Sequence, residues 1–331
     1  MKMNKLALVG AVALMTASGA AMAQKVCVFD LMGAQGDAFG MMKDYALFAK
    51  GKGVNLELSP YTSESVAMSD LTAGQCDMAL MTGLRGREMN TFTGSMDSLG
   101  GIPSYTVLKK VYATLANPAV APLMVQNGYE VAGLAPAGAA YLFVNDRGIN
   151  SVEKLAGKKI AAFDYDKAQA KMIQKIGAQP VSADITNFGA KFNNGSVDVI
   201  GAPALAYKPL ELFRGLGTKG AIVHFPILQL SFQLIMKQNK FPAGFGQESR
   251  TYWVGQYDRA MGLINRAEAT VPKSAWMELP DADKAKYVVL MRDSRIALTN
   301  DGIYNKKMTH VLRMARCSVN GSDPECTQNL E

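Results

Sequence analysis

The chain has 331 residues, of which 49% are hydrophobic and 19% charged, and its formal net charge at pH 7 is +7. This balance is typical of a globular protein with a packed core and excludes a disordered chain. The basic residues are scattered and form no block with interleaved aromatic side chains, which argues against nucleic acid as a partner.

The N-terminus has the order of a secretory signal peptide. Lys2 and Lys5 form a short basic region, residues 6–15 are almost wholly apolar, and small residues lead to Ala21-Met22-Ala23. Such a run is too short for a membrane anchor, which needs roughly 20 apolar residues. We therefore expect residues 1–23 to be a signal peptide cleaved after Ala23, and the mature protein to be periplasmic. Loss of two lysines lowers the net charge from +7 to +5.

Four cysteines remain after this cleavage, and an even number in an oxidising compartment indicates disulfides. Four cysteines allow three connectivities. We favour Cys27–Cys76, which would join neighbouring strands, and Cys317–Cys326, which closes a short loop with Asn-Gly and Asp-Pro turns. The competing interpretation, a metal site, lacks a Cys-x-x-Cys motif, and the chain has only two histidines.

The first part of the mature chain alternates short apolar strands with helices, a pattern that builds a parallel sheet. The predicted strands cover residues 25–30, 55–58 and 77–81, and the predicted helices cover residues 38–50 and 64–72.

The alternation restarts near residue 141. The predicted strands here are 141–145, 159–163, 179–181 and 197–200, and the predicted helices are 151–155, 167–176 and 187–193. A small repeat supports a second similar unit, because residues 71–77 and 192–198 each place an aspartate three residues after a glycine. This spacing predicts a helix ended by a left-handed glycine and followed by a strand.

The last third predicts three helices, at residues 252–269, 282–298 and 304–316. We expect an α/β protein of two lobes, each a mainly parallel sheet flanked by helices, with a ligand cleft between them. Lobe 1 would comprise residues 24–139 and 225–331, lobe 2 residues 140–224, and the C-terminal helices would brace both.

Catalytic motifs are absent from the chain. It has no Gly-x-Ser-x-Gly elbow, no His-Glu-x-x-His pair and no phosphate-binding Gly-x-x-x-x-Gly-Lys loop. We therefore expect a binding protein rather than an enzyme, with no cofactor and no metal.

In parallel α/β sheets, ligands bind beyond the carboxyl ends of the strands, and this rule selects the candidate site. The candidate ligand-binding residues lie in or after such strands: Asp30, Gln35, Arg85, Arg87, Tyr141, Asp164, Tyr165 and Tyr207. Arg85 and Arg87 are suited to a carboxylate or phosphate, or alternatively form an ion pair in a solvated loop. Asp166 beside Tyr165 is suited to cap the following helix.

Three motifs resemble the solute-binding proteins of TRAP-type transporters: NSVEKLAGKKI at 150–160, IGAQPV at 176–181 and FNNGSVD at 192–198. The resemblance implies two α/β lobes, an interlobe cleft that closes by hinge motion, and the membrane subunits of a transporter as partner. The expected function is a periplasmic receptor that captures a small molecule and delivers it to such a transporter.

The chain departs from that family where it contacts the ligand's carboxylate. The resemblance implies an arginine just after the start of the Gly-Lys-Lys-Ile strand and an asparagine after the Gly-x-x-Asp strand. Here the matching positions are Ala161 or Ala162, and Ala202. We therefore expect a larger or less acidic ligand. The alternative is an accessory protein of a drug efflux or resistance system with an aminoglycoside-type ligand, because some similar sequences carry that label.

Overall fold

The structure is a computed structural model that describes residues 23–328 and 330–331. The predicted signal peptide therefore lies, except for Ala23, outside the described residues. Among the described residues, no helix combines the length and the apolar character that crossing a membrane requires.

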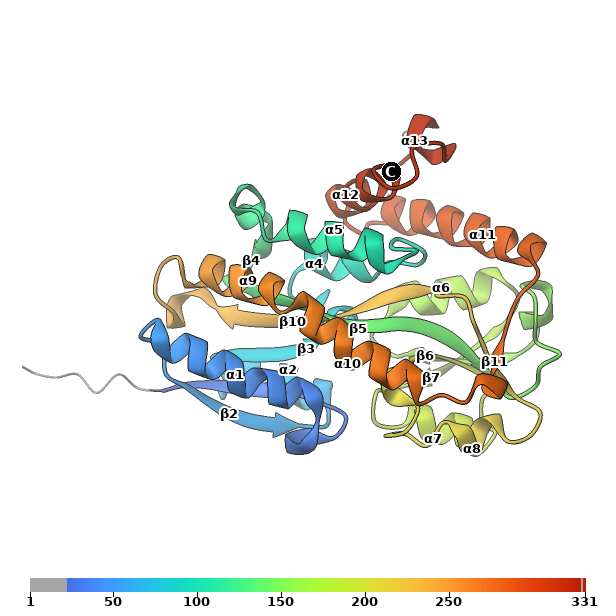
Figure 1. Cartoon of the computed structure of the whole chain (residues 1–331), viewed down its shortest axis with the longest axis horizontal. Coiled ribbons are helices and arrows are strands. Elements are labelled where there is room, and N and C mark those ends of the chain that lie inside the picture. The colour runs from blue at the N-terminus through green and yellow to red at the C-terminus, as the bar shows by residue number, and fades with distance from the viewer. Residues whose placement is uncertain (1–22, 329) are drawn as a thin grey trace, which may run out of the picture.

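The first half of the molecule is built on three parallel strands (Figure 1). The central strand β1 (Gln24–Phe29) pairs with β2 (Leu56–Tyr61) and β3 (Met78–Thr82). The crossover helices α1 (Asp37–Gly51) and α2 (Glu64–Ala73) connect them. The strands and helices predicted for this part are confirmed.

The second half repeats this arrangement with β6 (Lys159–Phe163) parallel to both β7 (Gln179–Ala183) and β8 (Val199–Pro203). The helices α6 (Lys167–Lys175) and α7 (Phe188–Asn193) connect these strands. The predicted helix at 151–155 is only a 3-10 turn, Glu153–Leu155.

The repeated glycine–aspartate spacing has the same structure in both halves. Gly74 and Gly195 are left-handed, with φ of 83° and 76°, as the spacing predicts. The aspartate that follows each glycine accepts a hydrogen bond from the backbone N–H of a lysine in the neighbouring strand. Asp77 Oδ2 lies 3.0 Å from Lys25 N, and Asp198 Oδ2 lies 2.9 Å from Lys159 N. The motif thus forms the same turn and the same hydrogen bond to the neighbouring strand in both halves.

Two long strands, β5 (Tyr129–Val144) and β10 (Leu228–Lys237), join the halves. The sheet order is β2-β1-β3-β10-β5-β8-β6-β7, with β10 antiparallel to β3 and β5, and β5 antiparallel to β8. One continuous sheet therefore runs through the molecule. The sequence predicted only the last residues of β5, because its first part is rich in alanine and glycine rather than β-branched residues.

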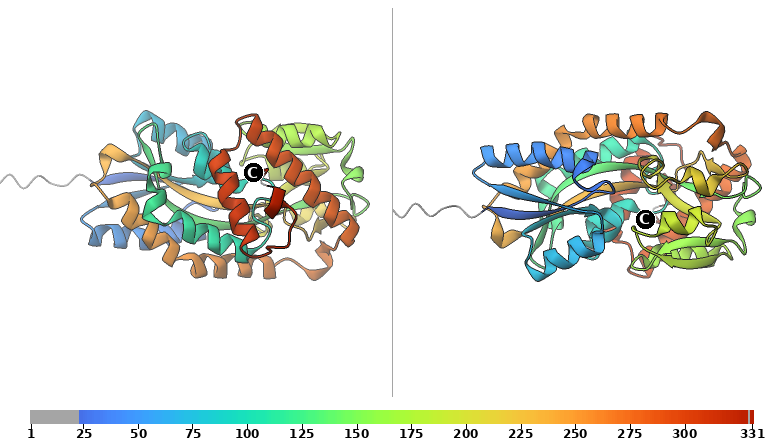
Figure 2. Two further views of the ribbon diagram at one scale, coloured as in Figure 1. Left: turned by 90° about the horizontal axis from the view of Figure 1, so that it is seen from above. Right: turned by 90° about the horizontal axis from the view of Figure 1, so that it is seen from below.

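The C-terminal segment bridges the halves as predicted. Helix α11 (Asp281–Asn300) packs Tyr287 and Met291 into the second-half core, whereas α12 (Lys306–Cys317) packs Met308 and Leu312 against the first-half helices. Seen from above, the red helix α12 lies near the middle of the molecule and α11 extends from there over the second half (Figure 2).

The predicted helix at 252–269 is wrong in one respect. It is two helices, α9 (Phe245–Gly255) and α10 (Tyr257–Ala269), separated at Gln256. Gln256 N donates to Trp253 O, three residues back, which ends α9 beside a glycine of low helix propensity.

The remaining elements are short connections. They are α3 (Gly83–Gly86), α4 (Thr91–Gly94), α5 (Tyr105–Leu115), β4 (Val125–Gln126), α8 (Phe213–Leu216), β9 (Ala221–Val223), β11 (Trp276–Met277) and α13 (Glu325–Gln328). Further 3-10 turns occupy Gly33–Gln35, Ser95–Asp97, Pro118–Met124, Ala204–Ala206, Gln238–Lys240 and Lys273–Ala275.

Both favoured disulfides are present. Cys27 in β1 is bonded to Cys76, two residues before the start of β3, with the Cα atoms 6.0 Å apart. Cys317 at the end of α12 is bonded to Cys326 in α13, with the Cα atoms 5.7 Å apart. The first bond fixes the centre of the first half, and the second fixes the C-terminal turn.

The two disulfides should differ in their effect on stability. They span 49 and 9 residues of chain, and a longer loop restricts the unfolded state more. We expect Cys27→Ala/Cys76→Ala to lower the free energy of unfolding by about 4 kcal/mol, and Cys317→Ala/Cys326→Ala by about 3 kcal/mol. Urea unfolding of both variants measures this. A larger loss for the C-terminal pair would contradict the loop argument.

Candidate functional site

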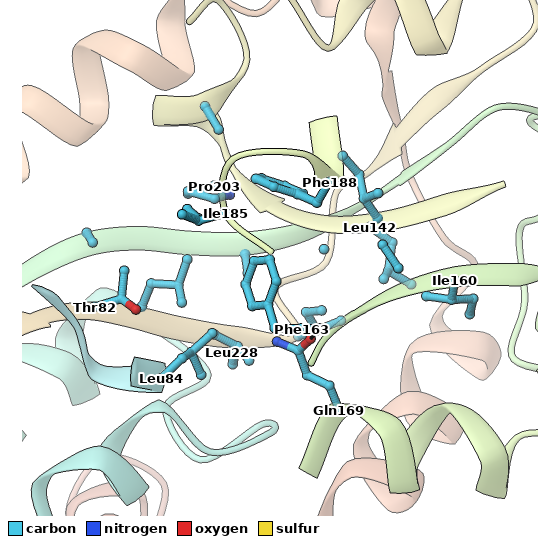
Figure 3. Close-up of a pocket in the computed structure, with 18 of the residues that line it drawn as sticks. Thr82, Leu84, Leu142, Ile160, Phe163, Gln169, Ile185, Phe188, Pro203 and Leu228 are labelled. Atoms are coloured by element: carbon cyan, nitrogen blue, oxygen red, sulfur yellow. Dashed lines mark hydrogen bonds between the residues drawn. The ribbon is translucent and has the colours of Figure 1, made fainter. Parts of the chain in front are cut away.

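A cavity of about 140 Å³ lies between the two halves of the sheet. Phe29 of β1 and Met172 of α6 line it from opposite halves. Thr82 of β3 and Phe163 of β6 do the same (Figure 3). The long strands β5 and β10 also contribute wall residues, namely Ala137, Ala140, Leu142, Leu228, Leu230 and Phe232. The cavity therefore lies at the carboxyl ends of β1 and β3, where a ligand is expected in such a sheet, and extends along β6 and α6 into the second half.

The wall of this cavity is almost wholly apolar. Among the residues that the structure describes, Thr82 and Gln169 are its only polar side chains, and no lysine, arginine, histidine or carboxylate lines it. Ala161, at a position where the resemblance implies an arginine, is part of the wall. The cavity therefore offers no ionic partner to a charged ligand.

Gln169 is the one wall residue with a hydrogen-bond donor directed to the cavity. Its Oε1 accepts from Phe163 N at 3.0 Å, which fixes the amide, and its Nε2 forms no hydrogen bond within the described part of the chain. Thr82, in contrast, is used locally, because its Oγ1 accepts from Arg85 N at 3.4 Å and caps α3.

A buried ion pair joins the two halves beside the cavity. Arg87 Nη1, which follows β3, lies 2.9 Å from Asp166 Oδ1, which precedes α6, and the two side chains are 10% and 2% exposed. Asp166 also caps α6, because the same oxygen accepts from Ala168 N at 3.0 Å. The predicted helix cap is thus confirmed. The alternative of ion pairs is also found: the pair of Arg87 is buried, whereas Arg85 pairs with the exposed carboxylate of Glu88.

A stacked pair reinforces this contact. The guanidinium carbon of Arg85 lies 3.5 Å from the ring centroid of Tyr165, and the Tyr165 hydroxyl donates to Glu64 Oε2 at 3.4 Å. Glu64 is fully buried and accepts from Thr82 N at 2.6 Å, and burial raises the pKa of its carboxyl. Arg85, Arg87, Tyr165 and Asp166 thus form one cluster that joins the two halves.

A second buried polar contact, between Asp97 and Ser231, lies near the charge of Arg87. Asp97 accepts hydrogen bonds from Ser231 N at 2.9 Å and Ser231 Oγ at 2.7 Å. Burial raises the pKa of Asp97 to about 7, and the nearby charge of Arg87 partly opposes that rise. This contact ties the loop after β3 to the long strand β10.

Of the predicted site residues, the structure brings Arg85, Arg87 and Tyr165 together, with Asp164 exposed next to them. None of the eight lines the cavity. Their role in ligand binding stays a prediction.

The other predicted residues lie apart from that cluster. The Asp30 carboxylate accepts from Ala38 N at 2.9 Å and Phe39 N at 3.1 Å, and so stabilises the start of α1. Gln35 is exposed. The Tyr141 hydroxyl donates to Glu268 at 3.0 Å, and Tyr207 is buried beside Phe143.

Sequence reasoning did not select the apolar wall, although the residues that it selected are adjacent in the chain to wall residues. Leu31, Leu84, Phe163 and Ala206 line the cavity, and each is the chain neighbour of a predicted residue. Selection for polar side chains passed over them. The available signal was Ala161, where a charged residue was expected and a small apolar one is found.

The interlobe ion pair should contribute strongly to stability, because removing one partner leaves a buried charge. We expect Arg87→Ala and Asp166→Ala each to lower the free energy of unfolding by about 3–5 kcal/mol, and the double variant to lose much less than their sum. Lys171→Ala is the control, since its pair with Asp301 is about half exposed and should contribute at most about 1 kcal/mol. Additive losses in urea unfolding would contradict the pairing.

Solved structures of TRAP periplasmic solute-binding proteins have a similar fold. The TRAP periplasmic solute-binding protein of Ralstonia eutropha H16 with bound (S)-2-acetolactate matches with a TM-score of 0.72 at 12% identity, covering 90% of this chain and 98% of that chain. The one from Shewanella oneidensis with bound succinate matches with a TM-score of 0.71 at 11% identity, covering 89% and 99%. The chain thus has the α/β fold of TRAP periplasmic solute-binding proteins, and the predicted fold class is confirmed.

The sequence comparisons are more specific. The family model described as "Solute-binding protein AdeT 1/2" matches residues 46–331. The protein named "Probable solute-binding protein AdeT1" from Acinetobacter baumannii is 48% identical over 304 residues, covering 92% of this chain and all of that protein. "Probable solute-binding protein AdeT2" of the same organism is 26% identical over 227 residues, covering 68% and 94%. The chain belongs to the AdeT1/2 family of solute-binding proteins.

Proposed function

We propose that this protein is a periplasmic receptor that captures a small molecule between its lobes and delivers it to the membrane subunits of a TRAP-type transporter. The observation that carries the proposal is the cavity enclosed by both halves of a chain that belongs to a solute-binding family. We propose lobe boundaries at 24–139 with 225–331, and 140–224, which place the cavity between the lobes.

Hinge motion would occur in the two long strands, because β5 and β10 are the sheet strands that join the halves. Their pairing is interrupted next to the cavity. Leu230 pairs with Gly138 and Ser231 with Pro136, so that Ala137 is skipped as a bulge and lines the cavity. A bulge bends and twists a strand locally. Opening would separate Arg87 from Asp166 and expose the cavity to solvent.

Binding without turnover fits the chemistry of the site. The cavity wall has no nucleophile paired with a base. Within the described part of the chain, no group of three or more His, Cys, Asp or Glu side chains is placed to hold a metal ion.

The alternative of an efflux accessory with an aminoglycoside ligand has no support in this cavity. A polycationic ligand would need carboxylates, and none is among the wall residues. The solute receptor is therefore the function that we propose.

Native ligand release tests the proposal. Protein purified from the periplasm should release one small molecule per chain on denaturation, identified by mass spectrometry. Refolded protein should then contract in small-angle X-ray scattering when this molecule is added back. At 100 times its Kd the ligand should raise the free energy of unfolding by about 2.7 kcal/mol.

Cavity filling provides the matched variant for that experiment. Ala161→Phe places a large side chain in the cavity wall and should abolish ligand release and contraction, whereas Ala190→Phe, on the exposed side of α7, should leave both unchanged. If wild-type protein carries no ligand and contracts with none, the receptor proposal is wrong.

A further inference from the structure

We propose that the ligand of the interlobe cavity is an uncharged molecule with a single aromatic ring and one carbonyl group. The proposal rests on the receptor function given above, and it assigns the chemical class of the solute. Four properties of the cavity carry it: its lack of charge, its volume, its phenylalanine rings and the amide of Gln169.

The lack of charged side chains in the wall argues against anions such as the succinate bound in the Shewanella oneidensis protein. Placing an isolated carboxylate in an apolar cavity is strongly unfavourable unless a cation pairs with it. Arg85 and Arg87, which follow the wall residue Leu84 in the chain, do not line the cavity. Arg87 pairs with Asp166. Arg85 is stacked on Tyr165 and forms an ion pair with Glu88 at 3.1 Å. Asp166, a residue of the protein itself, thus takes the arginine that could otherwise meet a ligand carboxylate.

The volume of the cavity sets the size of the ligand. At about 140 Å³ it is close to an engineered cavity of about 150 Å³, lined by Leu, Ile and Phe, that stays dry and binds benzene. A molecule of about six to ten non-hydrogen atoms fills such a space. The lobes would close around one ring with a short substituent.

Aromatic side chains face this space from both halves. Phe29 and Phe232 form one pair with ring centroids 6.5 Å apart, and Phe163 and Phe188 form another, edge to face, at 5.4 Å. All four line the cavity. Aromatic rings prefer offset or edge-to-face contacts with each other, so two such pairs favour a ring over an aliphatic chain.

Gln169 supplies the single polar contact. Its amide is held by the bond to Phe163 N, and its Nε2 donor enters an otherwise apolar wall (Figure 3). Gln169 is half-buried, and its Nε2 would lose contact with solvent when a ligand fills the cavity, so a ligand with one acceptor satisfies the site better than a hydrocarbon. A carbonyl oxygen on the ring substituent provides that acceptor.

Calorimetric titration of the refolded mature protein tests the assignment with four probes: acetophenone, ethylbenzene, benzoate and succinate. Acetophenone should bind, ethylbenzene about tenfold more weakly because it lacks the acceptor, and benzoate at least about 100-fold more weakly because it is charged. Succinate should not bind.

Two variants assign the contacts. Gln169→Leu should bring acetophenone down to the affinity of ethylbenzene while ethylbenzene still binds, which shows that the cavity is intact. Ala161→Arg should abolish acetophenone binding and improve benzoate binding, whereas the surface variant Ala190→Arg should change neither.

Preferred binding of benzoate or succinate, lost in Arg85→Met, would overturn the ligand class and leave the receptor function standing. Failure of all four probes, with a charged molecule released from native protein, would do the same. Absence of any released ligand and of contraction would instead contradict the receptor function itself.

Discussion

The path of two strands determines the rest of this structure. Because β5 and β10 run through both halves, backbone hydrogen bonds tie the lobes into one sheet, and relative motion must bend these strands. Their pairing slips at Ala137, at the place where the strands form part of the cavity wall. The proposed hinge and the proposed ligand site thus coincide. A ligand that fills the cavity touches the strands that must bend and both lobes that they carry.

Polar and apolar interactions are separated in space around the cavity. Arg85, Arg87, Tyr165 and Asp166 join the halves at the rim, whereas the interior carries hydrophobic side chains and the amide of Gln169. A charged ligand could join two lobes by forming ion pairs with side chains of both. In this chain the protein provides both partners of the ion pair, so that the ligand need only fill space and satisfy one donor. With the ligand class proposed above, selectivity would depend on desolvation and shape rather than on charge.

Much of the fold could be predicted from local patterns. The alternation of strands and helices and the Gly74 and Gly195 turns follow from residue periodicity and backbone preferences. The start of β5 could not, because small residues around Pro136 have no strand preference and extend only through pairing with β10. The residues of the cavity wall could not be predicted either, because apolar residues that line a cavity and apolar residues of the core have the same pattern in sequence. The sequence signal was that Ala161 or Ala162 stands where the resemblance implies an arginine, and Ala161 lines the cavity.

The central claim is that the interlobe cavity binds its ligand by burying apolar surface. The most direct measurement is calorimetric titration of acetophenone into the refolded protein at several temperatures and two salt concentrations. The account predicts a clearly negative heat-capacity change of binding and an affinity that does not respond to salt. A heat-capacity change near zero, with binding that weakens as salt is added, would show that charge controls recognition and would contradict the account.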